Sequence, residues 1–291
     1  MRLVYKFGQG RGFGAEMMEI LWLSYRCRLL KIDFVEQTDP YPRGVSIDRG
    51  WQDYFVRVFP TTHLDGPVAR LNRHMYSRLG QRGLRPIARR LLDRRLRSKN
   101  LYIFDHGELQ HRAAERQREA ESGEAGLPTI RNHSEGIYRF RDEVLANLAT
   151  TEPNTTPYIA VHIRRGDKIT EAAYADLDLY KRAIERIPDW RSKPFYVLSD
   201  SRKAIDDFLT LIRPVELIGS TPDAGAGYDQ KSFNALPPAD RYRETLRIIS
   251  DLEIARHSEH FVGTATSNVF WLMRIIHRRG GAALLDVHKA G

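Results

Sequence analysis

Three short apolar runs in the second half of the chain each end in a group of polar side chains, and this pattern limits the folds open to it. The runs are 158–161, 194–198 and 260–263. Their length and apolar character are typical of strands buried on both faces of a parallel sheet. Because the carboxyl ends of parallel strands meet at one edge, the pattern predicts an α/β fold with a ligand site at that edge.

The first run is followed by the densest group of charges. His162, Arg164, Arg165, Asp167 and Lys168 stand within a stretch of seven residues. Paired arginines at a strand end suit a phosphate or pyrophosphate, because each guanidinium presents a fork of N–H donors. A buried network of arginine and aspartate at a seam between domains would use the same residues, and the sequence leaves this alternative open.

The second and third runs carry polar groups of another kind. Asp200 follows the second run. The third run leads through 264–268 into an apolar segment, 269–277, which has the pattern of a helix. Hydroxyl groups and free N–H groups at a helix N-terminus attract anions. The alternative is a simple N-cap, in which Thr266 or Ser267 satisfies the first helical turn.

These segments together resemble a known family. The motif His-x-Arg-Arg-x-Asp-Lys at 162–168 resembles the first signature of the α-1,6-fucosyltransferases, which include the core fucosyltransferase of N-glycans and the rhizobial nodulation enzyme. Segments similar to the second and third signatures follow in order, at 196–200 and between 248 and 268. The same core motif occurs in α-1,2-fucosyltransferases and protein O-fucosyltransferases, but Lys168 and the Thr-Ser-Asn segment favour the α-1,6 type.

The resemblance implies an inverting transfer of L-fucose from GDP-fucose to a glycan hydroxyl, with no metal required. It also implies a GT-B-like α/β fold with two facing Rossmann-like domains. We expect an N-terminal domain on the acceptor side at 1–150 and a C-terminal domain that binds the GDP-sugar at 151–291. A passage rich in Thr, Pro and Asn at 149–157 is the expected link between them.

For catalysis we expect Arg164 to stabilise the β-phosphate of the departing GDP, since a strand-end guanidinium can supply the charge that develops there. A carboxylate near Lys168 is the natural base for the acceptor hydroxyl, with Glu171 as the first candidate and Asp167 as the second. Glu171 could equally be a first-turn helix acid stabilised by the macrodipole. The spacing from Lys168 to Glu171 is one residue shorter than in the core enzymes.

The glycine turn Gly12-Phe13-Gly14, between an expected strand and an expected helix, resembles the turn that opens these enzymes. The resemblance assigns His162 and Asp251 to the guanosine. The full set of residues expected to bind the donor is His162, Arg164, Arg165, Asp200, Asp251, Thr264, Thr266, Ser267, Asn268, Gly12 and Gly14.

A metal site of the DxD type is not expected. The nearest acidic pairs, Asp176-x-Asp178 and Asp206-Asp207, lie in helix-like surroundings, where a solvated helix face is the simpler interpretation. The expected partners are therefore GDP-fucose and an oligosaccharide or glycoconjugate acceptor, without a cofactor.

The net charge suggests a second function. The segment from Arg78 to Lys99 carries nine basic residues and one acidic residue, so it holds +8 of the net charge of +9. A helix over 86–97 could contact an acidic partner, a membrane surface or nucleic acid, or it could be a solvated face. A nucleic-acid-binding protein and a non-catalytic relative that binds a nucleotide sugar or a glycan therefore remain as alternatives to the transferase.

The remaining sequence features concern the compartment and the N-terminal half. A single cysteine, Cys27, excludes an internal disulfide, and no apolar run is long enough to span a membrane. We expect a cytoplasmic enzyme or, alternatively, the catalytic fragment of a secretory-pathway enzyme. The N-terminal half predicts a strand at 3–7, a helix from Phe13 and a strand at 29–34. The aromatic segment 51–55 suits core packing better than an acceptor groove.

Overall fold

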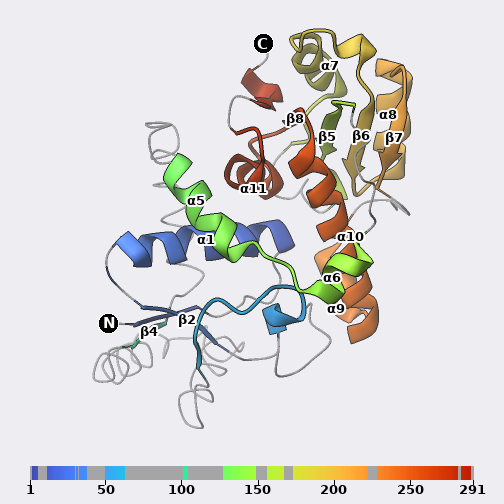
Figure 1. Ribbon diagram of the computed structural model, residues 1–291. Coiled ribbons are helices and arrows are strands. Elements are labelled where there is room, and N and C mark those ends of the chain that lie inside the picture. Colours follow the sequence, from blue (N-terminus) through green and yellow to red (C-terminus); the bar gives the residue numbers. More distant parts are fainter. Residues whose placement is uncertain are drawn as a thin grey trace, which may run out of the picture.

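Two parallel β-sheets with their covering helices make up the part of the chain that the structure describes (Figure 1). The structure is a computed structural model, and it describes residues 2–5, 12–29, 31, 33–37, 50–62, 101–103, 127–148, 156–166, 173–221, 228–280 and 283–289. The basic segment 78–99 lies outside these ranges, so the helix expected there stays a prediction.

The N-terminal sheet has the strand order β3-β2-β1-β4, and every neighbouring pair is parallel. Its strands are β1 (Arg2–Tyr5), β2 (Asp33–Gln37), β3 (Thr61–Thr62) and β4 (Leu101–Ile103). Helix α1 (Phe13–Leu29) connects β1 to β2 and lies over the sheet. The βαβ opening expected from the sequence is therefore present.

The strand expected at 29–34 begins later than predicted. Helix α1 continues to Leu29, and β2 begins at Asp33. Buried Leu23 and Cys27 extend the helical spacing of the apolar residues, and basic residues in the last turn favour a helix C-terminus. Lys31 then has a φ of 53°, a left-handed conformation that ends the helix.

The C-terminal sheet has five strands in the order β7-β6-β5-β8-β9, again all parallel. Its strands are β5 (Ile159–Ile163), β6 (Phe195–Ser199), β7 (Leu217–Ser220), β8 (His260–Gly263) and β9 (Leu284–Asp286). The three apolar runs that the sequence marked as strands are β5, β6 and β8, and they lie side by side.

Helices cover both faces of this sheet (Figure 1). They are α7 (Leu177–Glu185), α8 (Arg202–Ile212), α10 (Pro238–His257) and α11 (Asn268–Ile276), with short 3₁₀ turns η4 (Trp190–Ser192) and η6 (Val287–Lys289); the short helix α9 (Gln230–Ala235) precedes α10. Alternate residues of β5 face opposite sides: Val161 packs in the cluster with α7 and α8, and Ala160 in the cluster with α10 and α11. Burial on both faces explains why the strands are continuous apolar runs.

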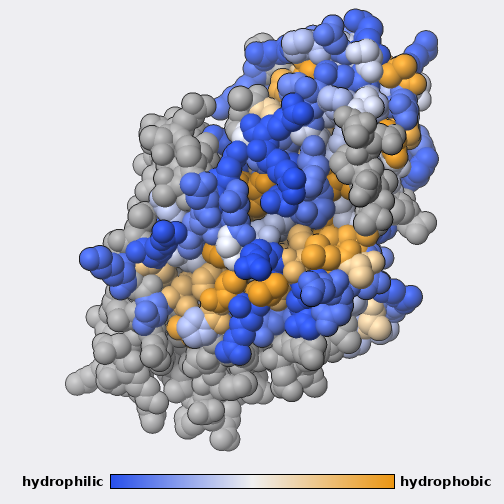
Figure 2. Space-filling view, in the orientation of Figure 1, coloured by the Kyte–Doolittle hydropathy of each residue, from blue (hydrophilic) through white to orange (hydrophobic). Residues whose placement is uncertain are grey.

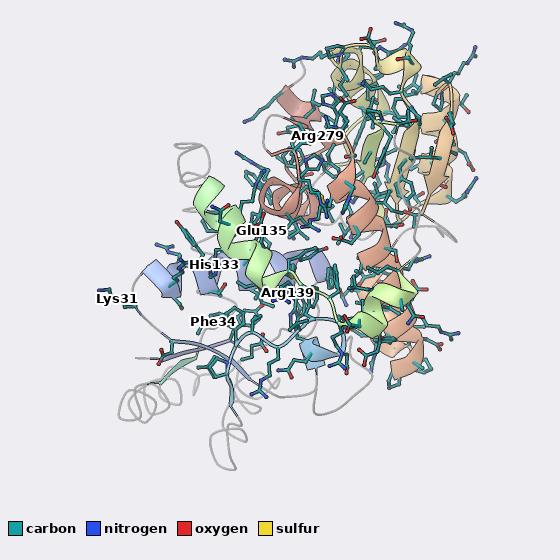
Figure 3. All side chains as sticks on the ribbon, viewed as in Figure 1. Lys31, Phe34, His133, Glu135, Arg139 and Arg279 are labelled. Carbon is teal, nitrogen blue, oxygen red and sulfur yellow. The ribbon has the colours of Figure 1, made fainter. Side chains whose placement is uncertain are left out.

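One of these two clusters extends from the C-terminal sheet into the N-terminal half. It runs from α10 and α11 through α1 and α5 (Leu127–Ile137) to the 3₁₀ helix η1 (Gly50–Asp53) and the residues after it. On α5, His133 points toward α1, where its Nε2 lies 3.0 Å from Ser24 Oγ (Figure 3). Trp51 and Phe55 are buried and stacked with ring centroids 4.2 Å apart. Core packing is therefore the correct interpretation of the aromatic segment 51–55.

The short helix α6 (Asp142–Asn147) precedes the expected link between the domains. Most of that link, 149–155, lies outside the described residues, and the domain boundary stays a prediction. The face shown in Figure 2 is mainly hydrophilic around the helices of the C-terminal sheet, and apolar residues form a band across its middle. None of the described helices is long and apolar enough to cross a membrane.

Candidate active site

The polar groups that follow β5, β6 and β8 meet at one edge of the C-terminal sheet. Ile163 pairs with Ser199 across β5 and β6, and Val161 pairs with Val262 across β5 and β8. The chain runs outward from β5 to β6 and β7, then returns to the other side of β5 with β8. Such a reversal of strand order is where α/β sheets bind ligands.

Asp200 connects three backbone segments at this edge. Its Oδ1 accepts a hydrogen bond from the Arg165 backbone N–H at 2.9 Å, and its Oδ2 accepts one from the Tyr228 N–H at 3.2 Å. The guanidinium of Arg164 donates to the same Oδ2 and completes an ion pair. The side chains of this pair are 20% and 14% exposed. Asp200 therefore holds the turn after β5 in place, and the Arg–Asp network that the sequence left open is present.

Gly166 makes the turn possible. Its φ is +62°, a conformation that L-residues rarely adopt. A Cβ at this position would lie 2.4 Å from the carbonyl oxygen of Tyr228 and 2.5 Å from its backbone nitrogen. The backbone at Tyr228 therefore packs directly on the backbone beside Arg164 and Arg165.

His162 is buried at the end of β5, next to the turn. Burial, and secondarily the charge of Arg164, lowers the pKa of His162 to about 3, so the imidazole is neutral. Its Nδ1 is buried and makes no hydrogen bond to the described part of the chain. The assignment of His162 to the guanosine stays a prediction.

Asp251 lies on α10 beneath the ends of β6 and β7. Its carboxylate accepts hydrogen bonds from the Tyr196 hydroxyl and the Thr221 hydroxyl, each at 2.7 Å. Burial raises the pKa of Asp251, and these two hydrogen bonds act in the opposite direction. The structure thus gives Asp251 a bridging role between helix and sheet, and a contact with guanosine stays a prediction.

The turn between β8 and α11 places hydroxyl groups at the start of the helix. Ser267 is the N-cap of α11, since its Oγ accepts a hydrogen bond from the Val269 N–H at 3.2 Å. Thr264 is buried, and its Oγ1 lies 3.0 Å from Oγ1 of Thr266. The N-cap interpretation is therefore confirmed for Ser267, whereas Thr266 and Asn268 remain exposed at the helix start.

The glycine turn near the N-terminus lies against this same helix start. A Cβ on Gly14 would be 3.4 Å from Val269 Cγ2 and 3.7 Å from the Val269 backbone nitrogen. Gly12 is exposed at the beginning of α1, and its carbonyl accepts the first hydrogen bonds of that helix. The N-termini of α1 and α11 therefore converge, and the partial positive charge of both favours an anion between them.

Two tyrosines that the sequence analysis did not single out lie against the paired arginines. The Arg164 Cζ is 5.5 Å from the ring centroid of Tyr228, and the Arg165 Cζ is 5.0 Å from that of Tyr174. No local pattern marks these tyrosines, because only the fold brings Tyr228 next to Arg164. The structure also gives the two arginines different partners, so their guanidinium groups do not form a single paired binding site.

Three predicted catalytic residues, Asp167, Lys168 and Glu171, lie outside the described residues. Their roles stay predictions.

The acidic pairs on helices are explained by helix chemistry. Asp176 is the N-cap of α7, and Asp206 and Asp207 form exposed i,i+4 ion pairs on α8. Within the described ranges, no group of three or more His, Cys, Asp or Glu side chains could hold a metal.

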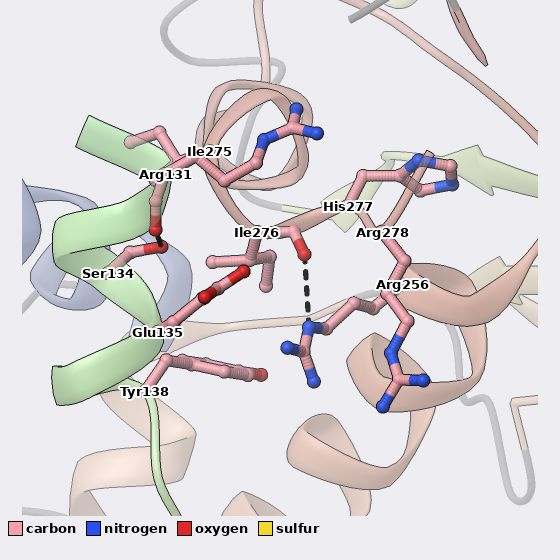
Figure 4. A pocket seen from close by; sticks show the side chains of 9 residues that line it. All are labelled: Arg131, Ser134, Glu135, Tyr138, Arg256, Ile275, Ile276, His277 and Arg278. Atoms are coloured by element: carbon pink, nitrogen blue, oxygen red, sulfur yellow. Dashed lines mark hydrogen bonds between the residues drawn. The ribbon is translucent and has the colours of Figure 1, made fainter. Parts of the chain in front are cut away.

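A polar cavity of about 340 Å³ lies at the opposite end of α11, between α5 and the last turn of α10 (Figure 4). Two of its three arginines donate to carbonyl groups at the end of α11. Arg256 Nε donates to the carbonyl of Ile276 at 3.0 Å, and Arg131 donates to that of Arg274 at 3.4 Å. Cations commonly stabilise helix C-termini in this way. The cavity is therefore part of the seam between helices and is separate from the sheet edge.

Comparison with known proteins is informative at the level of the fold. No protein-family model and no curated protein matches the sequence. Among solved structures, the chain is similar to NodZ α-1,6-fucosyltransferase co-crystallised with GDP, with a TM-score of 0.54 at 14% identity over 94% of this chain and 92% of that one. The chain has the fold of GDP-fucose fucosyltransferases.

Two further structures support this result. Fucosyltransferase NodZ from Bradyrhizobium gives a TM-score of 0.52 at 15% identity, covering 94% of this chain and 92% of that one. Arabidopsis thaliana FUT1 in complex with GDP gives 0.52 at 9% identity, covering 95% and 68%. The GT-B-like α/β fold expected from the sequence is confirmed.

Proposed function

We propose that this protein is a glycosyltransferase that moves L-fucose from GDP-fucose to a glycan hydroxyl with inversion, and that it is of the α-1,6 type. One observation carries the proposal: Arg164 follows the central strand β5, whose neighbour β8 leads into α11, and the N-terminus of α11 lies against that of α1. Solved enzymes of this fold include NodZ with GDP bound, which supports a GDP-sugar as the ligand.

The diphosphate of the donor would bind at the convergence of α1 and α11. Backbone N–H groups and the partial charge of two helix N-termini suit phosphate oxygens, with Gly12, Gly14, Thr266 and Asn268 at the contact. Thr264 and Ser267 would hold the turn in shape through their hydrogen bonds. The guanosine would then lie toward His162, whose buried ring is neutral.

Arg164 would act on the leaving group. As the bond from fucose C1 to the β-phosphate oxygen breaks, negative charge develops on GDP, and a fixed guanidinium stabilises it. Asp200 and the turn at Gly166 would keep Arg164 in place before the donor arrives. Arg164 together with the helix N-termini supplies positive charge at the diphosphate, which is why we propose catalysis without a metal.

The acceptor hydroxyl requires a base. In the proposed step Glu171 takes the hydroxyl proton while the acceptor oxygen forms its bond to C1 on the face opposite the departing GDP. Inversion follows from this single displacement. Asp167 is the second candidate for the base, and Lys168 would supply a nearby positive charge. Chitin-like oligosaccharides, N-glycan cores, lipopolysaccharide and peptides are the acceptor classes to screen.

Steady-state kinetics with GDP-fucose test the role of Arg164. We expect Arg164→Ala to lower kcat by roughly a hundredfold or more, the effect of removing one charged stabiliser of the transition state. Arg243→Ala is the matched control, because Arg243 is 76% exposed on α10 and forms an ion pair with nearby Asp240. Near-normal turnover of Arg164→Ala would overturn its assignment.

Glu171→Gln tests the base separately. The amide is close in size to the carboxylate and cannot take a proton, so we expect GDP affinity to be retained while transfer is lost. Persistent transfer would place the base elsewhere. Binding of GDP by the wild type without transfer or donor hydrolysis would indicate the non-catalytic relative. Salt-dependent nucleic-acid binding that needs 78–99, without GDP binding, would indicate the nucleic-acid alternative.

A further inference from the structure

The two tyrosines against the paired arginines differ in how they are held. Tyr174 is 38% exposed, and its hydroxyl donates to the Gly166 carbonyl at 2.6 Å. Tyr228 is half-buried, and its own backbone is fixed on both sides. Its N–H donates to Asp200, and the next residue, Asp229, is the N-cap of α9 and accepts from the Ser232 N–H. Tyr228 is thus the more rigid of the two.

The close approach of Gly166 restricts Tyr228 further. Backbone atoms of Tyr228 occupy the space that any side chain at 166 would need. The hydroxyl of Tyr228 donates to Gln230 Oε1 at 2.9 Å, which fixes the far end of the ring. The ring is therefore held at its backbone and at its tip, with its face toward the Arg164 guanidinium at 5.5 Å.

The geometry has a chemical consequence for Arg164. A guanidinium carries its N–H donors in its plane, and an aromatic face attracts the cation without using any of them. Asp200 accepts a hydrogen bond from Nη1 of the group. A ring at the face and a carboxylate at one edge together fix the plane of the guanidinium, and with it the direction of its in-plane donors.

We propose that Tyr228 is a positioning residue of the donor site, whose ring sets the plane of the Arg164 guanidinium against the diphosphate. This inference rests on the proposed function, because it assumes that Arg164 contacts the donor. It adds a residue from the segment before α9, outside the motifs that the sequence analysis used. The role belongs to the ring, and the hydroxyl serves only to hold it.

The test separates the ring from the hydroxyl and from folding. GDP affinity is measured by titration calorimetry, and kcat and KM with GDP-fucose, for Tyr228→Leu, Tyr228→Phe and Tyr228→Trp. We expect Tyr228→Leu to lose about threefold to thirtyfold in kcat, the range for a partly desolvated cation–π contact. Tyr228→Phe should stay within about twofold of the wild type, and Tyr228→Trp should restore most of the loss.

A double-mutant cycle shows whether the effect passes through Arg164. In the Arg164→Ala background we expect Tyr228→Leu to change GDP affinity no further, whereas it weakens GDP binding in the wild type. Equal losses in both backgrounds, or a Phe variant as weak as the Leu variant, would overturn the positioning role. If the wild type binds no GDP, the proposed function itself fails. If the wild type binds GDP and Tyr228→Leu has the same GDP affinity and kcat as the wild type, only the role of Tyr228 fails.

Discussion

Replacing Gly166 by alanine adds one methyl group to the turn that follows β5, and the structure gives two reasons why this change is costly. The backbone φ of +62° is left-handed, which costs an L-residue about 1–2 kcal/mol. The new Cβ would also lie 2.4 and 2.5 Å from backbone atoms of Tyr228, which no rotation of a side chain relieves. Forcing extra volume into a packed site costs about 1–3 kcal/mol more.

The expected loss for Gly166→Ala is therefore about 2–5 kcal/mol in the free energy of unfolding, and several degrees in Tm for a chain of this size. If the segment at Tyr228 moves away instead, less global stability is lost. Because that segment holds Asp200 and Arg164 in register, GDP affinity then falls. Urea unfolding followed by circular dichroism, together with a GDP titration, measures both effects.

Gly136→Ala is the matched control. Gly136 lies within helix α5, and nothing stands within 4 Å of the position its Cβ would take. Alanine is the better helix former, so we expect this variant to equal the wild type or to gain up to about 1 kcal/mol. A Gly166→Ala protein with wild-type stability and wild-type GDP affinity would refute the reasoning about the turn.

Three further predictions follow from single contacts. Asp200→Asn removes the charge that pairs with Arg164, and calorimetry should show GDP binding weakened by about tenfold or more, whereas exposed Asp207→Asn leaves it unchanged. Ser267→Ala removes the N-cap of α11 and should cost about 1 kcal/mol in urea unfolding, whereas Thr266→Ala should weaken GDP binding without that cost; the reverse pattern would contradict the site. Burial raises the pKa of Glu36 to about 7, so the folded state keeps a proton that the unfolded state loses above about pH 4.5. The stability that this proton contributes is lost as the pH rises through 7. We therefore expect the free energy of unfolding of Glu36→Gln, relative to that of the wild type, to be higher at pH 8 than at pH 5 by up to roughly 3 kcal/mol. Equal differences at both pH values would show that Glu36 is not protonated in the fold.

The strands and their shared edge could be predicted from the sequence because their signal is local. A strand buried on both faces must be apolar along its whole length, and β5, β6 and β8 show this pattern without any need for tertiary information. Polar residues directly after such strands can lie only at the carboxyl edge. For this reason the positions of Arg164 and Asp200 followed from the sequence.

The roles within the site could not be predicted in the same way. The donor contact expected for Asp200 stays a prediction, and its hydrogen bonds to the turn after β5 and to the segment before α9 could not be predicted, because they join segments far apart in the sequence. Tyr228 reaches Arg164 only because the fold brings that segment across the sheet edge. The start of β2 was also misplaced, because the short apolar stretch from Leu29 to Ile32 fits a helix end and a strand almost equally well until packing decides between them.

The most direct test of the account is titration calorimetry of GDP, GDP-fucose, GDP-mannose and UDP-sugars in the presence of EDTA, on the wild type and on Arg164→Ala. The account predicts metal-free binding that is selective for guanosine nucleotides and is strongly weakened in Arg164→Ala. Absence of binding for every guanosine nucleotide, or equal binding by the variant, would contradict the donor site at the end of β5.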